Sequence, residues 1–173
     1  MRRAVRRDRP LGAVDRPVKL SEVLAEPAVL LDLDGRDKWQ AISELTDRLA
    51  ATRQVPEAHR DAVHAALVAR EKSMSTGMEN GIAIPHTSVP LVEHPAVALG
   101  ISRAGIDFQA IDGRPTHLVI LLVNPANQTK AHIRTLAEIA RLLSSSELRT
   151  ALVRADTAAH VLSTIRAAEA VAT

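Results

Sequence analysis

Residues 69–90 read AREKSMSTGMENGIAIPHTSVP and join a helical pattern to an extended one. After the helix-forming start, residues 73–81 carry two glycines and an Asn-Gly pair, which predict a loop. The apolar run 82–84 then predicts a short strand that stops at Pro85. A helix, a loop and a strand in this order are typical of an α/β domain.

Further strands are expected on both sides of this stretch. Val97–Ile101 and His117–Val123 are apolar runs of strand length, and the second is dense enough in Leu, Ile and Val to be a central strand. Asp112-Gly113 predicts a tight turn between them. A further strand is expected over Ala28–Leu33.

The expected helices combine start signals with apolar residues at helical spacing. The start signals are Asp37 with Gln40, Pro56, Asn127 or Thr129, Ser144 with Glu147, and Thr157. The apolar faces are Leu20, Val23 and Leu24; Trp39, Ile42, Leu45 and Leu49; Val63, Ala66 and Leu67; and Ile133, Leu136, Ala137, Ala140 and Leu143. Because strands and amphipathic helices interleave, we expect an α/β fold: a three-layer sandwich of a mixed β-sheet flanked by helices.

The charge is concentrated at one end of the chain. Residues 1–16 hold six arginines and two aspartates, which leaves 16 of the 22 basic and 18 of the 20 acidic residues for the rest. Residues 1–17 are therefore interpreted as a basic, disordered tail, with a nucleic-acid-binding arm as the weaker alternative, and residues 18–173 as a single domain. In an export signal, an apolar segment follows the N-terminal arginines, but here the charged residues Asp8 and Arg9 follow them. We therefore expect a cytoplasmic protein.

Composition excludes several classes of function. The chain has no cysteine, which excludes a disulfide scaffold, cysteine-bound zinc, an iron–sulfur cluster and a thiol nucleophile. Trp39 and Phe108 are the only aromatic residues besides histidine, so surfaces that stack bases or sugar rings lose support. The run Leu118–Val123 is far too short to span a bilayer.

Three residues suit phosphoryl chemistry. His86 follows the conformationally restricted Pro85 and lies beside the glycine-rich loop, whose backbone N–H groups could face an anion. His132 lies in the first turn of an expected helix, where free N–H groups and the dipole favour negative charge. Arg70 directly precedes the loop and could supply a fixed positive charge. Together they suggest a site for a phosphoryl group of charge about −2.

The residues alone leave other interpretations open. A structural role for His86 weighs as much as a functional one, and Arg70 could simply complement a helix dipole. A metal hydrolase built on His86 and His132 lacks a third ligand at characteristic spacing. Glu71 and Glu79 are interpreted as ordinary surface acids. Four of the remaining histidines are interpreted as solvated or partly packed (His59, His64, His94, His160), and His117 is interpreted as a structural residue bonded to backbone.

The stretch 69–90 resembles the active-site signature of the fructose/mannitol-type (type-2) enzyme IIA domains of the bacterial phosphotransferase system, and residues 108–143 resemble the second block of that family. The resemblance implies that His86 is phosphorylated, on Nε2, by the phosphocarrier HPr. It implies that His132 stabilises the phosphoryl group and that Arg70 is the active-site arginine. Ser75, Thr76 and Gly77 would line the site. His86 is followed by Thr-Ser where many relatives have Gly-Lys or Gly-Thr, which leaves partner choice open.

Two functions follow from this resemblance. The first is a phosphotransferase relay that passes the phosphoryl group to a IIB domain during sugar uptake. The second is regulation by phosphorylation-dependent binding to other proteins, because residues 126–136 resemble the nitrogen-regulatory branch of the family. Both imply protein partners without a cofactor, a bound metal, direct sugar binding, nucleic-acid binding or membrane insertion.

Overall fold

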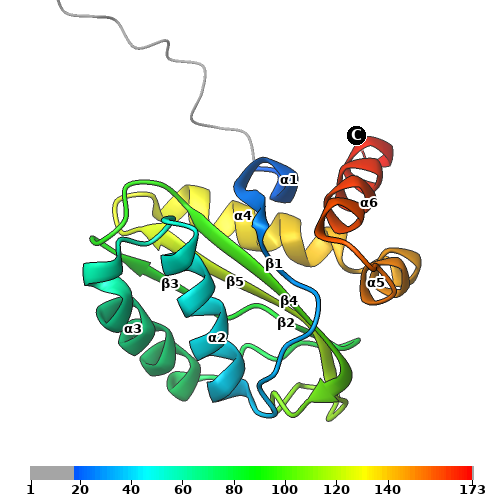
Figure 1. Ribbon diagram of the computed structural model, residues 1–173, viewed down its shortest axis with the longest axis horizontal. Helices are drawn as coiled ribbons and strands as arrows, with labels where there is room; N and C mark the ends of the chain where they lie inside the picture. The colour runs from blue at the N-terminus through cyan, green and yellow to red at the C-terminus, as the bar shows by residue number, and fades with distance from the viewer. Residues whose placement is uncertain (1–17, 173) are drawn as a thin grey trace, which may run out of the picture.

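The computed structural model describes residues 18–172 (Figure 1). The basic tail expected over residues 1–17 lies outside the described residues. Within them, a mixed five-stranded sheet has the order β1-β4-β5-β2, and β3 also pairs with β5. The strands are β1 (Leu24–Leu30), β2 (Ile82–Ala83), β3 (His86–Val89), β4 (Ala96–Ile106) and β5 (Thr116–Pro125). β4 and β5 are antiparallel, and the other pairings are parallel.

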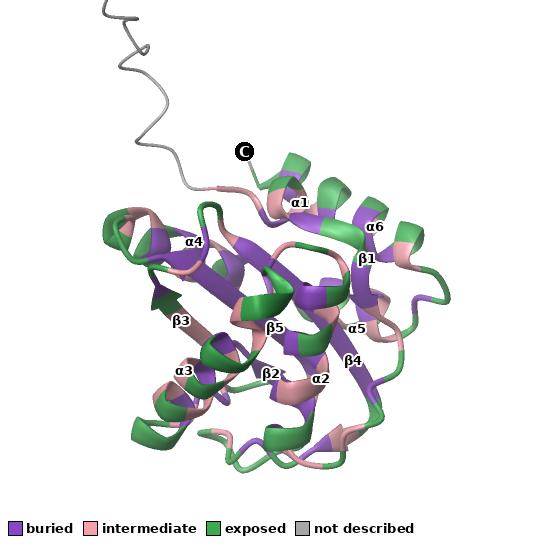
Figure 2. Ribbon diagram, turned by 60° about the vertical axis from the view of Figure 1, so that its left-hand side comes forward, coloured by how far each residue is buried: buried purple, intermediate pink, exposed green. Residues whose placement is uncertain are grey.

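Helices cover both faces of this sheet (Figures 1 and 2). They are α1 (Leu20–Val23), α2 (Lys38–Ala51), the 3₁₀ turn η1 (Glu57–His59), α3 (Arg60–Ser73), α4 (Thr129–Leu142), α5 (Ser146–Val153) and α6 (Ala158–Val171). In Figure 1, α2 and α3 lie in front of the sheet and α4 lies behind it. The predicted three-layer α/β sandwich is confirmed.

The centre of the sheet is the hairpin of β4 and β5. Nearly every residue of β5 and the first seven of β4 are buried, so both faces of these strands are covered (Figure 2). This confirms the central strand predicted from the apolar run. In the connection, the Gly113 N–H donates to the Ala110 carbonyl at 3.0 Å, and Gly113 has a φ of +67°. A glycine suits this left-handed backbone because it has no Cβ to clash.

The edges of the sheet differ from the prediction. β1 begins at Leu24 and ends at Leu30, whereas a strand over 28–33 was expected. Pro27 lies in this strand, between the paired residues Leu24 and Val29, where the register with β4 shifts. β3 was not predicted, because its four residues HTSV show no apolar alternation; backbone pairing with β5 makes them a strand.

Two predicted helix caps are confirmed and two are corrected. The Asp37 and Thr157 side chains accept from backbone N–H groups three residues later, at 2.9 and 3.0 Å. In the Ser-rich segment, Ser145 rather than Ser144 caps α5. The N-cap of α4 is Gln128, with no side-chain bond, instead of Asn127 or Thr129. Pro56 is followed by η1, so α3 itself begins at Arg60.

Two predicted helix faces are partly wrong. In α2, Ile42, Leu45 and Leu49 are buried as expected, but Trp39 is 37% exposed and Lys38 takes the buried position. In α4, Ile133 is 61% exposed. The buried residues of α4 are His132, Thr135, Ile139 and Leu142, so the helix is rotated relative to the expected face.

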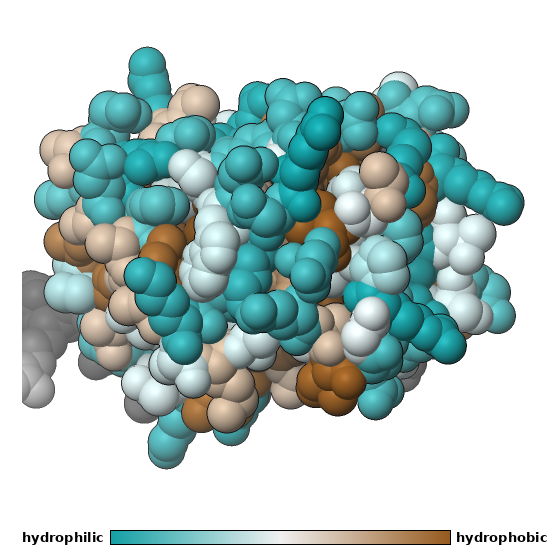
Figure 3. Space-filling model, turned by 90° about the horizontal axis from the view of Figure 1, so that it is seen from below, coloured by the Kyte–Doolittle hydropathy of each residue, from teal (hydrophilic) through white to brown (hydrophobic). Residues whose placement is uncertain are grey.

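The outer surface carries no broad apolar area on the face shown in Figure 3. There, apolar side chains form separate groups between hydrophilic ones. No helix within residues 18–172 combines the length and apolarity needed to cross a membrane.

Candidate active site

Three separate segments bring His86, His132 and Arg70 to one place. His86 is the first residue of β3, His132 lies in the first turn of α4, and Arg70 lies in the last turn of α3. The imidazole rings of His86 and His132 have centroids 5.4 Å apart and planes inclined by 51°. The positive charge of Arg70 is close enough to lower the pKa of both histidines. The fold thus brings together three residues that are up to 62 positions apart in the chain, from Arg70 to His132.

The hydrogen bond of His86 fixes which ring nitrogen is available. Its Nδ1 lies 2.7 Å from the Ile84 carbonyl oxygen, which can only accept, so Nδ1 carries the proton. Nε2 then holds the free lone pair in the neutral ring. Burial is the main cause that lowers the pKa of His86; the Ile84 carbonyl opposes it, and Arg70 lowers the pKa further. The geometry therefore presents a neutral imidazole with a nucleophilic Nε2.

His132 has the opposite arrangement. The side-chain amide of the buried Asn124, near the end of β5, donates from Nδ2 to Nδ1 of His132. The proton of the neutral His132 ring is therefore on Nε2. Burial, followed by the charges of His86 and Arg70, lowers the pKa of His132. One histidine of the pair thus offers a lone pair, and the other offers an N–H donor.

Arg70 is half-buried and held by the chain that follows it. Its Nη1 donates to the Met74 carbonyl at 2.8 Å, and the Ser73 hydroxyl donates to the Arg70 carbonyl at 2.7 Å. This anchoring uses one of the five guanidinium N–H groups, which leaves others for an anion.

One wall of the candidate site is formed by Ser75, Thr76 and Gly77, which bond to other groups of the protein. The Ser75 hydroxyl donates to the Phe108 carbonyl at 2.6 Å. A Cβ on Gly77 would lie 2.8 Å from that same oxygen, so this close approach requires glycine. The N–H groups of Thr76 and Gly77 donate to Glu71 and to the Ser75 hydroxyl. At these two positions the expectation of N–H groups that face an anion is therefore wrong, because both groups already bond within the protein.

Glu71 is a buried residue, which corrects its interpretation as a surface acid. It is 2% exposed, and its carboxylate accepts from the Thr76 N–H at 3.1 Å and the Thr76 hydroxyl at 2.5 Å. Lys38 Nζ, itself buried, lies 3.2 Å from Glu71 Oε1 and donates to Gln109 at 2.7 Å. Burial of both charges is compatible with folding because each has a charged partner and further hydrogen bonds. Glu79 is exposed, as expected.

A cavity of about 300 Å³ opens beside His86. His86 and Arg70 line it together with apolar side chains from the β4–β5 connection and α4, among them Ile111 and Leu136. Ile111, Met74 and Ile133 are 80%, 71% and 61% exposed. Ile111 lines this cavity, Met74 supplies the carbonyl that anchors Arg70, and Ile133 follows His132. We call these three residues the apolar rim.

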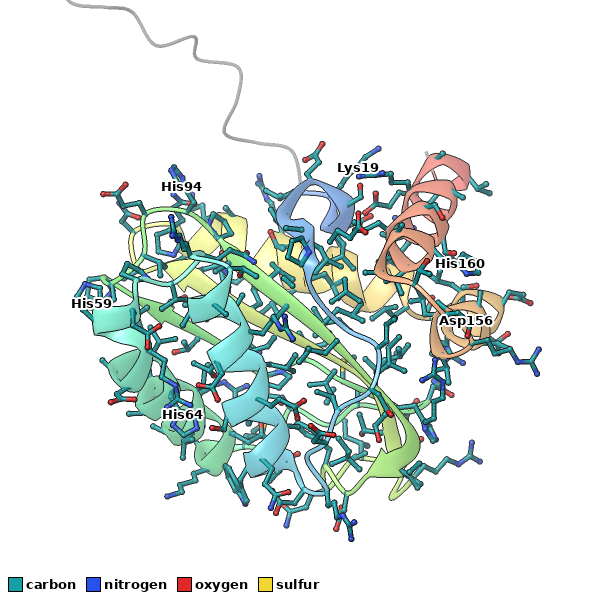
Figure 4. The ribbon with its side chains drawn as sticks, in the orientation of Figure 1. Lys19, His59, His64, His94, Asp156 and His160 are labelled. Atoms are coloured by element: carbon teal, nitrogen blue, oxygen red, sulfur yellow. The ribbon has the colours of Figure 1, made fainter. Side chains whose placement is uncertain are left out.

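The other histidines lie apart from this site. Figure 4 shows His59, His64, His94 and His160 spread over the outside of the fold, with His160 on the opposite side from His59. His117 Nδ1 lies 2.8 Å from the Ser102 carbonyl oxygen, which confirms its predicted backbone bond. In the part of the chain that the structure describes, no cluster of three or more His, Asp or Glu residues has metal-binding geometry.

Comparison with known proteins agrees with this arrangement. A model of the family described as "Phosphoenolpyruvate-dependent sugar phosphotransferase system, EIIA 2" matches residues 22–168. The chain belongs to this family. The family resemblance stated from residues 69–90 is thereby confirmed. IIA domains of this system are components of a phosphotransferase relay.

Individual relatives of this EIIA chain come from both branches of the family. The nitrogen regulatory protein of Pseudomonas aeruginosa is 34% identical over 141 residues, which cover 82% of this chain and 90% of that protein. The fructose-specific EIIABC component of Bacillus subtilis is 32% identical over 139 residues, covering 80% of this chain but 22% of that longer protein. The crystal structure of the nitrogen regulatory protein IIA-Ntr from Neisseria meningitidis matches with a TM-score of 0.77 and 29% identity, over 84% of this chain and 97% of that one.

The sequence did not lead to the contacts of three residues beside the candidate site: Lys38, Glu71 and Asn124. Two of them had a detectable signal. Glu71 continues the spacing of Val63 and Leu67, and Lys38 precedes Ile42 by four residues, so each charge falls on an apolar helix face. A charge at such a position indicates burial with a partner. Asn124 directly follows the apolar strand run and had no comparable signal.

Proposed function

We propose that this EIIA chain accepts a phosphoryl group on Nε2 of His86 from phospho-HPr and passes it to a IIB domain. The observation that carries the proposal is the pairing of His86 and His132 in opposite tautomers, with rings 5.4 Å apart beside Arg70. Such a pair supplies both the attacking lone pair and an N–H for the oxygens of the transferred group.

Each transfer exchanges one bond to phosphorus for another. The Nε2 lone pair of His86 forms the new nitrogen–phosphorus bond while the bond between phosphorus and the donor breaks, and its electrons leave with the donor. The His86 ring, still protonated on Nδ1, becomes cationic, and the Ile84 carbonyl stabilises that charge by accepting the Nδ1–H. The N–H of His132 Nε2 and the guanidinium of Arg70 stabilise the phosphoryl oxygens. Transfer to the acceptor reverses these steps.

The surroundings of His86 favour a relay over hydrolysis. The nearest buried carboxylate, that of Glu71, is occupied by Lys38 and Thr76, so it is not free to activate water. Ile111, which lines the cavity at His86, and the other exposed residues of the apolar rim suit contact with another protein surface, where such side chains become buried. These features support a phosphohistidine intermediate that persists until a protein acceptor docks.

The test is phosphoryl uptake from phosphoenolpyruvate through enzyme I and HPr, followed by addition of a IIB domain. An acid-labile gain of one phosphate that is lost to IIB supports the relay. A second function, regulation of partner proteins by the phosphorylation state of His86, is favoured by the 90% coverage of the Pseudomonas aeruginosa nitrogen regulatory protein. A complex that forms with only one phosphorylation state, together with no transfer to IIB, would favour that function.

His132→Ala is expected to slow phosphoryl uptake by about 100-fold, because one donor to the developing negative charge is removed while the nucleophile remains. The final amount of bound phosphate should be unchanged after long incubation. The rate is measured by intact mass at successive times, with His160→Ala on the distant α6 as control. A wild-type rate in His132→Ala would contradict the assigned role.

The rate of phosphoryl uptake at neutral pH is expected to persist when the pH falls somewhat below 6.5, the ordinary pKa of histidine. The reason is that burial lowers the pKa of His86 and of His132, so both rings stay neutral there. The lowered pKa values also make the free energy of unfolding depend on pH. Since the unfolded chain binds these protons first, the free energy of unfolding should decline as the pH falls below 6.5. Rates and urea unfolding are measured between about pH 5 and pH 8. Arg70→Gln should shift the acid limb of the rate profile to higher pH, and an unshifted limb would argue against this electrostatic role.

A further inference from the structure

A second cavity of about 300 Å³ lies away from His86 and shares none of its lining residues. It opens between the start of β5, the far half of β4 and α5, which lies against both strands. Arg103 on β4, Arg149 on α5 and Arg154 at the end of α5 line it. His117, Leu118 and Gly81 form part of its floor and walls.

The charge in this cavity is not neutralised by the protein. None of the lining residues is an aspartate or glutamate. Across the described residues, Arg103, Arg149 and Arg154 form no ion pair within 4.0 Å. Three arginines line this one small cavity, and their guanidinium groups carry like charges that a bound anion would offset.

Two of these guanidinium groups are fixed in place. Arg103 donates from Nη1 to the Leu31 carbonyl at 3.1 Å and from Nη2 to the Ala155 carbonyl at 3.0 Å. Arg149 donates from Nη1 to the carbonyls of Leu143 and Ser144, both at 2.8 Å. Each keeps further N–H groups that these bonds do not use. A cation held in this way loses little conformational entropy when it binds an anion.

We propose that this cavity binds a small metabolite that carries a phosphate group. Arginine forks match the paired oxygens of a phosphate, and three of them suit its double negative charge. Leu118 and Val153 supply apolar wall for an uncharged organic part of the ligand. A volume near 300 Å³ is at the small end of ligand sites, which favours a compact metabolite over a nucleotide.

The test is a titration of the full chain with inorganic phosphate, followed by the backbone amide signals in NMR. Saturable shifts are expected at Gly81, Leu118 and Thr150, which line the cavity. Arg154→Ala should weaken this binding by at least about fivefold, since a charged hydrogen-bonding group is removed. Arg154 is exposed and its side chain makes no hydrogen bond to the described residues, so the variant should fold normally. Arg166→Ala, an exposed arginine on α6, is the matched control and should bind like the parent.

Phosphate binding beside His86 is separated from binding in this cavity by its own signals. Gly77 and His86 report on the candidate active site, and Arg70→Ala should remove their shifts while those of Gly81 and Thr150 remain. The test of the proposed phosphate site is therefore independent of the test of the phosphoryl relay. Shifts at Gly81 and Thr150 that do not saturate, that chloride reproduces at equal ionic strength, or that survive Arg154→Ala unchanged would overturn it.

Discussion

His86→Ala is expected to abolish phosphoryl uptake completely. The substitution removes Nε2, the ring nitrogen that the bond from Nδ1 to the Ile84 carbonyl leaves unprotonated. His132 cannot replace it, because its Nδ1 is bonded to Asn124 and its Nε2 carries the proton. The measurement is intact mass after incubation with phosphoenolpyruvate, enzyme I and HPr, together with the acid lability of any added phosphate.

Two variants make this result interpretable. His94→Ala removes a histidine from the surface loop before β4 and should be phosphorylated like the parent. His86→Gln keeps a polar side chain of similar length without an imidazole nucleophile, and should also remain unmodified. Unchanged thermal unfolding of both His86 variants would show that the fold persists. Acid-labile phosphate on His86→Ala would place the acceptor elsewhere and refute the site.

Glu71→Ala is expected to have the largest effect on stability, with a loss of about 3–5 kcal/mol, because it leaves a buried charge without its partner. Lys38 Nζ would lose the carboxylate that lies 3.2 Å away. Thr76 would lose the acceptor of both its N–H and its hydroxyl, so the wall of the active site would loosen as well. The free energy of unfolding is measured by urea denaturation, and phosphoryl uptake is measured on the same samples below the transition.

The matched control is Glu79→Ala, which removes an exposed carboxylate from the loop that follows α3 and should change stability by less than about 0.5 kcal/mol. The double variant Lys38→Met with Glu71→Leu should recover much of the lost stability, because it removes both buried charges together. Equal losses in Glu71→Ala and Glu79→Ala would mean that the buried ion pair does not stabilise the protein.

The central strands of the fold could be predicted from sequence because their signal is strong and local. A strand buried on both faces needs a continuous apolar run, and residues 118–123 have one. β3 could not be predicted in this way. His86, Thr87 and Ser88 are extended because β5 offers a free row of backbone groups, and that neighbour is distant in the sequence. The same dependence on tertiary pairing moved the start of β1 four residues and its end three residues toward the N-terminus.

The candidate site was partly predictable, and the misses have one physical origin. His86, His132 and Arg70 were found as separate residues, but their meeting depends on how α3, α4 and β3 pack. The expected apolar face of α4 placed Ile133 inward, whereas the structure turns His132 and Thr135 inward and leaves Ile133 exposed. Apolar periodicity assumes that a helix buries its most hydrophobic side, and this helix instead buries a polar residue of the site.

The edges of the sheet bear on self-association between copies of the chain. An open strand edge can pair with the edge of another molecule and start aggregation. Here the residues after Ser75 bond along the outer side of β2: Met78 N–H donates to the Ile82 carbonyl, and Ile84 N–H donates to the Thr76 carbonyl. At the opposite edge, Pro27 removes a donor from β1. The loop beside His86 thus also covers the edge at β2, so backbone groups at β2 and at Pro27 offer little pairing to another copy of the chain.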